Sequence, residues 1–227
     1  MDTEKARFNM IEQQIRPWNV LDPQIIDLLW VVKREQFVPE SLRAQAFTDT
    51  EIPLLANGQP TGEVMLAPKV EARLLQDLQI GKHETVLEVG AGSGYMAALL
   101  GARAQKVLTL ESHPELAKVA AAHLRAAGID NVTVQHKDGS NATQAVSEAR
   151  FDVIVLSGSV PFVPQGWLDR LNPGGRLAAI VGELPVMRGE IITRGHGSQA
   201  GEYTTVSPFD TVTRPLAGFP QKEHFHF

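Results

Sequence analysis

Apolar residues recur at helical spacing in the first part of the chain. Phe8, Ile11 and Ile15 lie three or four positions apart and are followed by Pro17, which predicts an amphipathic helix that ends before the proline. Another helix is predicted from Lys69 to about Leu78. These segments predict a helical N-terminal region that reaches to about residue 80.

A further helix between these two carries start signals of its own. Asp22 is placed as its N-cap, and Pro23 stands in the first turn, where a missing N–H costs nothing. The helix is expected to end before Pro39. Its predicted buried face consists of Ile25, Ile26, Leu29 and Val32.

The segment Pro53–Pro68 reads "PLLANGQPTGEVMLAP" and has no clear period. Its proline and glycine content predicts a long irregular loop. Loops of this length without secondary structure are uncommon and are either functional or disordered. We therefore expect this segment to be a functional loop or a disordered one.

After Gly81 the pattern changes to short β-branched runs that alternate with helical runs. That rhythm predicts an α/β fold with a doubly wound, mostly parallel sheet covered by helices on both faces. The predicted strands are Thr85–Val89, Lys106–Leu110, Val132–Gln135, Phe151–Leu156 and Arg176–Val181. The helical runs are Met96–Gly101 and Glu115–Ala127; the second has the apolar stripe Leu116, Val119, Ala120, Leu124 and Ala127, with Gly128 as C-cap.

The last part of the chain has short strand candidates at Tyr203–Val206 and Asp210–Thr213, separated by Gly, Ser and Pro. We predict a single domain over residues 1–227. It consists of a helical cap with a substrate loop (1–80), a core (81–185) and a C-terminal strand extension with a tail (186–227).

Composition and charge limit the possible partners. The chain of 227 residues has a formal net charge of −5 and no long basic cluster, which argues against nucleic acid as a partner. It has no cysteine, no signal-peptide pattern and no apolar run of membrane-spanning length. We therefore expect a soluble cytoplasmic protein without a membrane partner. No sequence pattern specifies an oligomeric state.

The glycine-rich stretch "VLEVGAGSGYMAALL" (86–100) marks a ligand site. Gly90, Gly92 and Gly94 stand between a predicted strand and a predicted helix, where a side chain would block the approach of a ligand to the backbone. The run "GSGYMA" fits the loose dinucleotide pattern. However, the acid Glu88 just before the turn suits an ammonium group and would repel a pyrophosphate.

Two further acidic positions follow predicted strands. Glu111 stands about twenty residues after the turn, where a carboxylate accepts both ribose hydroxyls of either cofactor class. Asp138 and Gly139 follow the third strand, either as an ordinary Asp-Gly turn or as part of a cofactor site. These positions indicate a nucleoside without identifying it.

The run "EVGAGSG", from Glu88 to Gly94, resembles the first motif of the class I methyltransferases. The Asp138-Gly139 pair and "LNPGGRL" (171–177) are similar to later sequence motifs of that superfamily. The resemblance implies S-adenosyl-L-methionine as cofactor, with S-adenosyl-L-homocysteine as product, and a Rossmann-like sheet. The residues implied to bind it are Glu88, Gly90, Gly92, Ser93, Gly94, Glu111, Asp138 and Gly139.

More specific stretches resemble the protein-L-isoaspartate O-methyltransferases, which repair damaged proteins by methylating isoaspartyl carboxylates. These are "REQFVP" (34–39), "AFTDTEIPL" (46–54) and "FDVIVLSGSVPFVPQGWLDRLNPGGRLAAIVG" (151–182). The resemblance implies a transferase acting on a protein or peptide with isoaspartyl residues. A diverged enzyme acting on a small-molecule acceptor, or a cofactor-binding protein without this activity, is the alternative.

The substrate loop departs from the family pattern. Where the family has a Gly-Gln-Thr-Ile-Ser-Gln-Pro type sequence, this chain has "GEVMLAP" ending at Pro68, so Leu66 replaces the serine that helps hold the substrate carboxylate. Thr61 or Gln59 is a candidate to supply the lost polar group. Arg214 stands where the family usually has an apolar residue, either as a solvated residue or as an anchor for an anionic substrate.

No catalytic acid or base is assigned, because an isoaspartyl carboxylate is already ionised near neutral pH. The substrate-pocket candidates are Thr61, Leu66, Pro68 and Ser157; Ser157 follows the fourth strand, where it is either a substrate contact or a loop-capping residue. We expect no metal site, and place His224 and His226 of "HFHF" in a frayed end.

Overall fold

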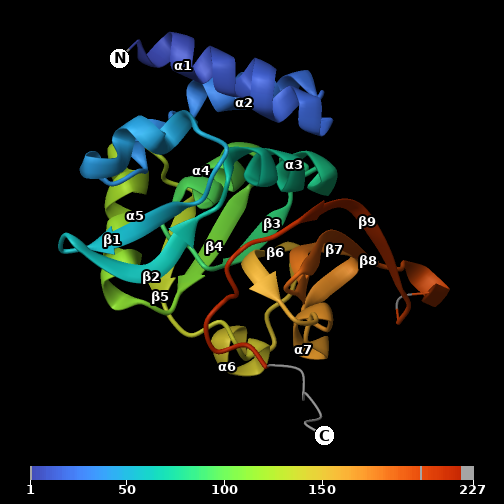
Figure 1. Cartoon of the computed structure of the whole chain (residues 1–227). Coiled ribbons are helices and arrows are strands. Elements are labelled where there is room, and N and C mark those ends of the chain that lie inside the picture. Colours follow the sequence, from blue (N-terminus) through green and yellow to red (C-terminus); the bar gives the residue numbers. More distant parts are fainter. Residues whose placement is uncertain (1, 200, 221–227) are drawn as a thin grey trace, which may run out of the picture.

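The computed structural model describes residues 2–199 and 201–220, and seven of the strands in this part of the chain form one sheet (Figure 1). The strand order is β5-β4-β3-β6-β7-β8-β9; the pairs β7–β8 and β8–β9 are antiparallel, and the other neighbouring pairs are parallel. The predicted doubly wound, mostly parallel sheet is confirmed. The strands are β3 (Thr85–Val89), β4 (Lys106–Glu111), β5 (Val132–His136), β6 (Phe151–Val160), β7 (Leu171–Glu183), β8 (Val186–Arg194) and β9 (Tyr203–Thr211).

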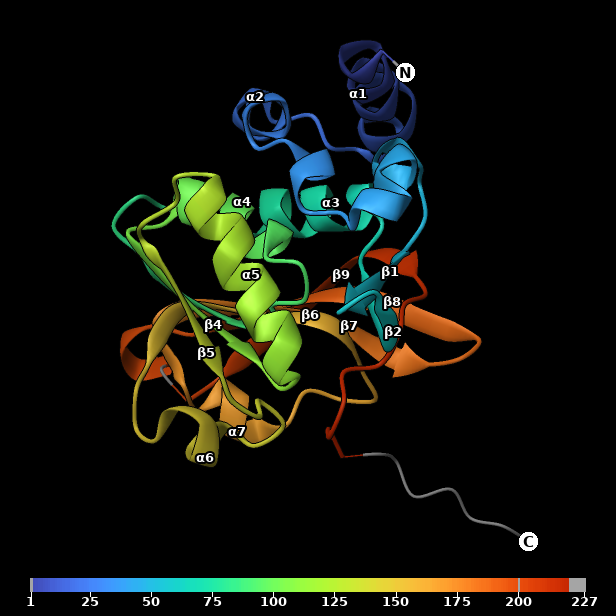
Figure 2. The same cartoon turned by 90° about the vertical axis from the view of Figure 1, so that its left-hand side faces the viewer.

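Helices cover both faces of the sheet (Figure 2). One face carries α3 (Pro68–Leu78), α4 (Tyr95–Arg103) and α5 (Pro114–Ala126), and the other carries the short helices α6 (Ala142–Val146) and α7 (Gln165–Leu168). Successive residues of β6 alternate between the two cores: Val153 and Val155 pack with the first, and Ile154 and Leu156 with the second. Both faces of the central strands are therefore buried, as expected for parallel strands.

The N-terminal cap lies over the first of these helical layers (Figure 2). Its elements are α1 (Thr3–Met10), a π-helical turn η1 (Ile11–Ile15), α2 (Pro23–Val31) and the 3₁₀ segments η2 (Arg16–Trp18), η3 (Arg34–Gln36) and η4 (Glu40–Phe47). Asp22 caps α2 as predicted, because its carboxylate accepts a hydrogen bond from Gln24 N at 2.8 Å. The predicted α2 face is buried, whereas Phe8 of the first predicted face is about half exposed.

The segment 53–68 is not the long loop that the sequence predicted. Instead, β1 (Ile52–Ala56) and β2 (Gln59–Met65) form an antiparallel hairpin. Asn57 and Gly58 connect the strands with φ values of 51° and 77°. Two left-handed residues in a row match the twist of a two-residue hairpin, and Asn-Gly is the pair that adopts them most readily. In the sequence-based prediction, the prolines on either side outweighed the hairpin signal of the Asn-Gly pair.

Other boundaries also differ from the prediction. The C-terminal extension consists of two long antiparallel strands, and β9 runs without a break from Tyr203 to Thr211, although Ser207 and Pro208 interrupt the pattern. The candidate strand Asp210–Thr213 is wrong beyond Thr211. Helices α6 and α7 were missed, since four or five residues are too few to display a period. No helix within residues 2–199 and 201–220 is long and apolar enough to cross a membrane.

A buried guanidinium joins the cap to the core. Arg34 of η3 is 1% exposed, forms an ion pair with Glu71 of α3 and donates to the Leu66 carbonyl at 2.6 Å. Its guanidinium carbon also lies 5.0 Å from the centre of the Tyr95 ring at the start of α4. Burial raises the pKa of Glu71 to about 7, and the Arg34 charge opposes that rise. The carboxyl therefore depends on Arg34 to remain ionised.

Replacing Arg34 by methionine should destabilise the fold, because it leaves Glu71 buried without its counter-charge. We expect the Arg34→Met variant to lose about 3–5 kcal/mol of unfolding free energy in urea denaturation at pH 8. The double variant Arg34→Met/Glu71→Met should lose clearly less, since it removes both charges. A single variant as stable as the double one would contradict the structural role of this pair.

Candidate active site

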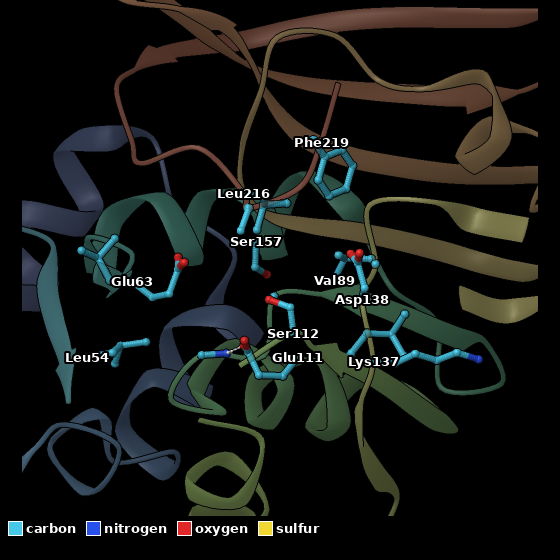
Figure 3. A pocket seen from close by; sticks show the side chains of 16 residues that line it. Leu54, Glu63, Val89, Glu111, Ser112, Lys137, Asp138, Ser157, Leu216 and Phe219 are labelled. Carbon is cyan, nitrogen blue, oxygen red and sulfur yellow. Dashed lines mark hydrogen bonds between the residues drawn. The ribbon is translucent and has the colours of Figure 1, made fainter. Parts of the chain in front are cut away.

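A cavity opens at the carboxyl ends of β3, β4 and β6, where the strand order reverses between β3 and β6 (Figure 3). In open parallel sheets this reversal leaves a crevice that ligands occupy. The glycine turn after β3 and the ends of β4 and β5 form its floor and one wall. Hairpin and C-terminal residues form the remaining walls: Leu54, Glu63, Val64, Leu216, Ala217 and Phe219.

The glycine turn runs between β3 and α4 with left-handed backbone at Gly90, Gly92 and Gly94. A Cβ on Gly90 would lie 2.9 Å from Leu216 Cδ2, and one on Gly92 would lie 3.0 Å from Leu54 Cδ1. The covering segments thus rest directly on the turn. Gly94 serves another purpose: it does not line the cavity and lets α4 pack closely against the Ala120 backbone of α5.

Glu111 lies at the end of β4 and lines the cavity, as Figure 3 shows. Its carboxylate accepts hydrogen bonds from Gly92 N at 2.8 Å and His113 N at 2.9 Å. These bonds fix its orientation, and each carboxylate oxygen keeps a free lone pair for a further donor. Glu111 therefore ties the glycine turn to β4 and still offers acceptors to a bound hydroxyl group.

Asp138 and Gly139 lie beyond Glu111, after β5. Asp138 is exposed, and its Oδ1 accepts from Ser140 N at 2.8 Å, so the Asp-Gly pair forms a turn as well as part of the cavity wall. A Cβ on Gly139 would lie 2.4 Å from Val89 Cγ1, which explains why the smallest residue stands there. Figure 3 shows Phe219 at the same end of the cavity as Asp138.

Glu88 is buried completely, unlike Glu111 and Asp138. Its two carboxyl oxygens accept hydroxyl hydrogen bonds from Thr109 at 2.6 Å and Ser157 at 2.8 Å. Burial raises the pKa of Glu88 to about 7, and the nearby charges of Glu71 and Glu111 add to the rise. Glu88 lines a second, smaller cavity that shares Gly90, Gly92, Val64 and Ser157 with the first.

The structure brings together some of the predicted substrate residues and not others. Ser157 lines both cavities, and Leu66 and Ser93 line the second one. Thr61 lines neither: its hydroxyl donates to the Leu54 carbonyl at 2.9 Å and stabilises the hairpin. Pro68 also lies outside both cavities and occupies the first turn of α3.

Apart from Arg214, sequence reasoning missed the C-terminal side of the site. Arg214 and Leu216 flank a short parallel bridge to β6, because Ser159 N donates to the Arg214 carbonyl at 3.0 Å and Leu216 N donates to the Ser159 carbonyl at 2.9 Å. No local sequence pattern predicts that the C-terminal segment pairs with β6. The hairpin side was also missed, although the Asn-Gly pair carried a usable signal for it.

The polar groups of the site are mostly acceptors. Glu63, Glu111 and Asp138 face one cavity, and Glu88 faces the other. Lys137 is a lining residue, but its amino group points away from the cavity centre in Figure 3. This set fits a ligand that carries ammonium, hydroxyl and amino donors better than one that carries phosphates. Within the described residues, no group of His, Asp and Glu could hold a metal ion; His224 and His226 lie outside them.

The family model described as protein-L-isoaspartate(D-aspartate) O-methyltransferase matches residues 5–212. The chain belongs to this family. A protein-L-isoaspartate O-methyltransferase of Koribacter versatilis is 35% identical over 212 residues, which are 93% of this chain and 90% of the relative. One from Herpetosiphon aurantiacus is 34% identical and covers 97% of this chain and 94% of its own length.

A solved structure of another protein has the same fold as this chain. It comes from Plasmodium falciparum and is described as a protein-L-isoaspartate O-methyltransferase in complex with S-adenosyl-L-homocysteine. The two chains superpose with a TM-score of 0.76 at 19% identity, over 95% of this chain and 98% of the other. The fold is therefore shared over nearly the whole of both chains.

The buried carboxyl of Glu88 should make folding depend on pH. Its folded pKa of about 7 lies above the unfolded value near 4.5, so its contribution to stability is complete below pH 4.5 and is lost as the pH rises through 7. We expect the unfolding free energy of the Glu88→Gln variant to fall less over this range, by up to about 3 kcal/mol.

Urea denaturation at several pH values measures this difference. A Glu40→Gln variant is the matched control, because Glu40 is exposed at the start of η4 and its replacement should leave the pH dependence unchanged. Equal pH dependence of the wild type and Glu88→Gln would mean that the pKa of Glu88 is the same in the folded and unfolded chain.

Proposed function

We propose that this chain is an S-adenosyl-L-methionine-dependent methyltransferase that methylates the carboxylate of L-isoaspartyl residues in damaged proteins. The observation that carries the proposal is the glycine turn framed by Glu88, Glu111 and Asp138, in a chain that the family model matches over 208 of 227 residues (5–212). Family membership favours this acceptor over another carboxylate or a small molecule.

The residues of the site fit the cofactor by their chemistry. Gly90 and Gly92 line the cavity without a side chain that would block the approach of a ligand to the backbone, and Glu111 offers carboxylate acceptors for the ribose hydroxyls. Asp138, next to Gly139, is positioned for the adenine amino group. Glu88 and Ser93 line the second cavity, where a carboxyl suits the ammonium group. These assignments are supported by the acceptor-rich lining.

The main task of the protein in this reaction is to align the attacking carboxylate with the methyl group and the sulfur of the cofactor. When bound, the cofactor supplies a methyl group on a positively charged sulfur, which an ionised carboxylate attacks without help from a general base. The apolar side chains of Leu54, Leu216 and Phe219 cover the cavity and exclude water, which would otherwise hydrate the reacting groups. Accordingly, none of the residues is assigned a proton-transfer role.

Arg214 supplies the positive charge that the altered substrate loop lacks. Val64 and Leu66 line the site with apolar side chains and offer no side-chain donor to an anionic acceptor. Arg214 is exposed, its backbone is held by Glu51, and its charge lowers the pKa of Glu63 in the cavity. This proximity favours the role of an anchor for the substrate carboxylate.

We further propose that residues 1–227 act as one methyltransferase domain, with the cap (1–80), core (81–185) and extension (186–227) expected from the sequence. Within the cap, Arg34 contacts the core through the Tyr95 ring, and the extension contributes two strands to the core sheet. The partner is a protein or peptide, and the cytoplasm stays the predicted location.

Transfer of labelled methyl from the cofactor to an isoaspartyl peptide tests the function. We expect transfer to this peptide and none to the same peptide with normal aspartate. The Glu111→Gln variant should remain folded and bind S-adenosyl-L-homocysteine about tenfold more weakly by calorimetry, because one charged acceptor is lost. Binding of the cofactor without any isoaspartyl transfer would refute the proposed acceptor.

Replacing Arg214 by leucine tests the anchor. We expect KM for the isoaspartyl peptide to rise about fivefold with little change in kcat, since an exposed ion pair contributes little more than this. Arg125→Leu is the control, because Arg125 is an exposed residue near the end of α5 and away from the cavity. An unchanged KM in the Arg214→Leu variant would mean that Arg214 is a solvated surface residue and does not anchor the substrate.

A further inference from the structure

Glu63 is a cavity carboxyl that the proposed chemistry has not used. It belongs to β2, is half-buried and lines the main cavity. Figure 3 shows its side chain extending from the hairpin into the cavity, toward the wall that carries Ser157. No hydrogen bond or ion pair reaches its carboxyl oxygens from the residues that the structure describes.

The other carboxyls of the site differ from Glu63 in this respect. Glu111 accepts from two backbone N–H groups, Glu88 from two hydroxyls, and Asp138 from Ser140 N. Their negative charge is partly balanced by these donors. In the described part of the chain, Glu63 alone among them is directed at the cavity with both oxygens available.

Glu63 lies among charged groups of both signs. Burial raises the pKa of its carboxyl and the Glu111 charge on β4 adds to that, whereas Arg214 on the C-terminal segment and His113 after β4 lower it. The remaining charged groups of the cavity are Asp138 and Lys137 after β5. A cation placed in the cavity would relieve the repulsion between Glu63 and Glu111.

We propose that Glu63 is a specificity-determining residue that distinguishes the methyl donor from the demethylated product by charge. This inference rests on the proposed function, which brings a cationic sulfonium into the cavity and leaves a neutral thioether there after transfer. An ionised Glu63 attracts the first and has no charge to attract in the second. The two ligands otherwise have the same adenosyl and amino-acid groups, so the rest of the site treats them alike.

A consequence for turnover follows from this arrangement. The Glu63 carboxylate adds affinity for the incoming methyl donor. This added affinity is lost after methyl transfer, because the sulfur is then neutral. The product therefore dissociates more readily than the shared contacts alone would allow, which limits product inhibition.

Calorimetry with the protein of residues 1–227 and its Glu63→Gln variant tests the proposal, since the amide keeps the shape and removes the charge. We expect the variant to bind S-adenosyl-L-methionine about tenfold more weakly and S-adenosyl-L-homocysteine within about twofold of the wild type. Glu63→Ala should show the same selective loss. The control is Glu202→Gln, an exposed acid beside β9 at the opposite edge of the sheet, which should change neither affinity.

Two results would overturn the inference while leaving the proposed function intact. Equal weakening of both ligands would show that Glu63 contacts a group they share, and unchanged binding of both would show that its charge does not reach the sulfur. A wild-type protein that binds neither ligand would overturn the proposed function as well. Circular dichroism of each variant establishes that the binding data refer to folded protein.

Discussion

The buried guanidinium of Arg34 is the constraint on which the site depends most. It meets Glu71 of α3, the Leu66 carbonyl at the end of β2 and the ring of Tyr95 at the start of α4. A charge placed so deep is tolerated only with close partners on several sides. Because those partners come from the residue that follows the hairpin, from α3 and from the helix that follows the glycine turn, one side chain connects the hairpin wall of the cavity to the elements that form its floor.

Around that framework the chain uses one kind of functional group in several environments. Glu88 is fully buried between two hydroxyls, Glu111 is oriented by backbone N–H groups, and Glu63 is half-buried without such partners. Burial and hydrogen bonding have opposite effects on the charged form of a carboxyl. The site therefore presents carboxyl groups in three different environments to a ligand that is itself cationic at some atoms and neutral at others.

The sequence predicts the parts of this arrangement that are local. Strand β3, the glycine turn and Glu111 follow from period, spacing and residue type, and the order of strands follows from their alternation with helices. Leu54 and Glu63 were not predicted because prolines hid the hairpin, although Asn57 and Gly58 favour a tight turn. Leu216 and Phe219 depend on a crossing between segments more than fifty residues apart, since Leu216 N bonds to the Ser159 carbonyl. Thr61 looked like a substrate donor, but its hydroxyl serves the hairpin backbone.

The crossing of the C-terminal segment over the glycine turn has a consequence for a chain that loses its last residues. Every strand of the sheet precedes Leu216 and Phe219 in the chain, and so does the hairpin. A chain cut after β9 would keep every one of these strands but lack one wall of the cavity. Proteolysis at that point would separate the scaffold from the complete ligand pocket, because this wall belongs to a segment that follows the last strand.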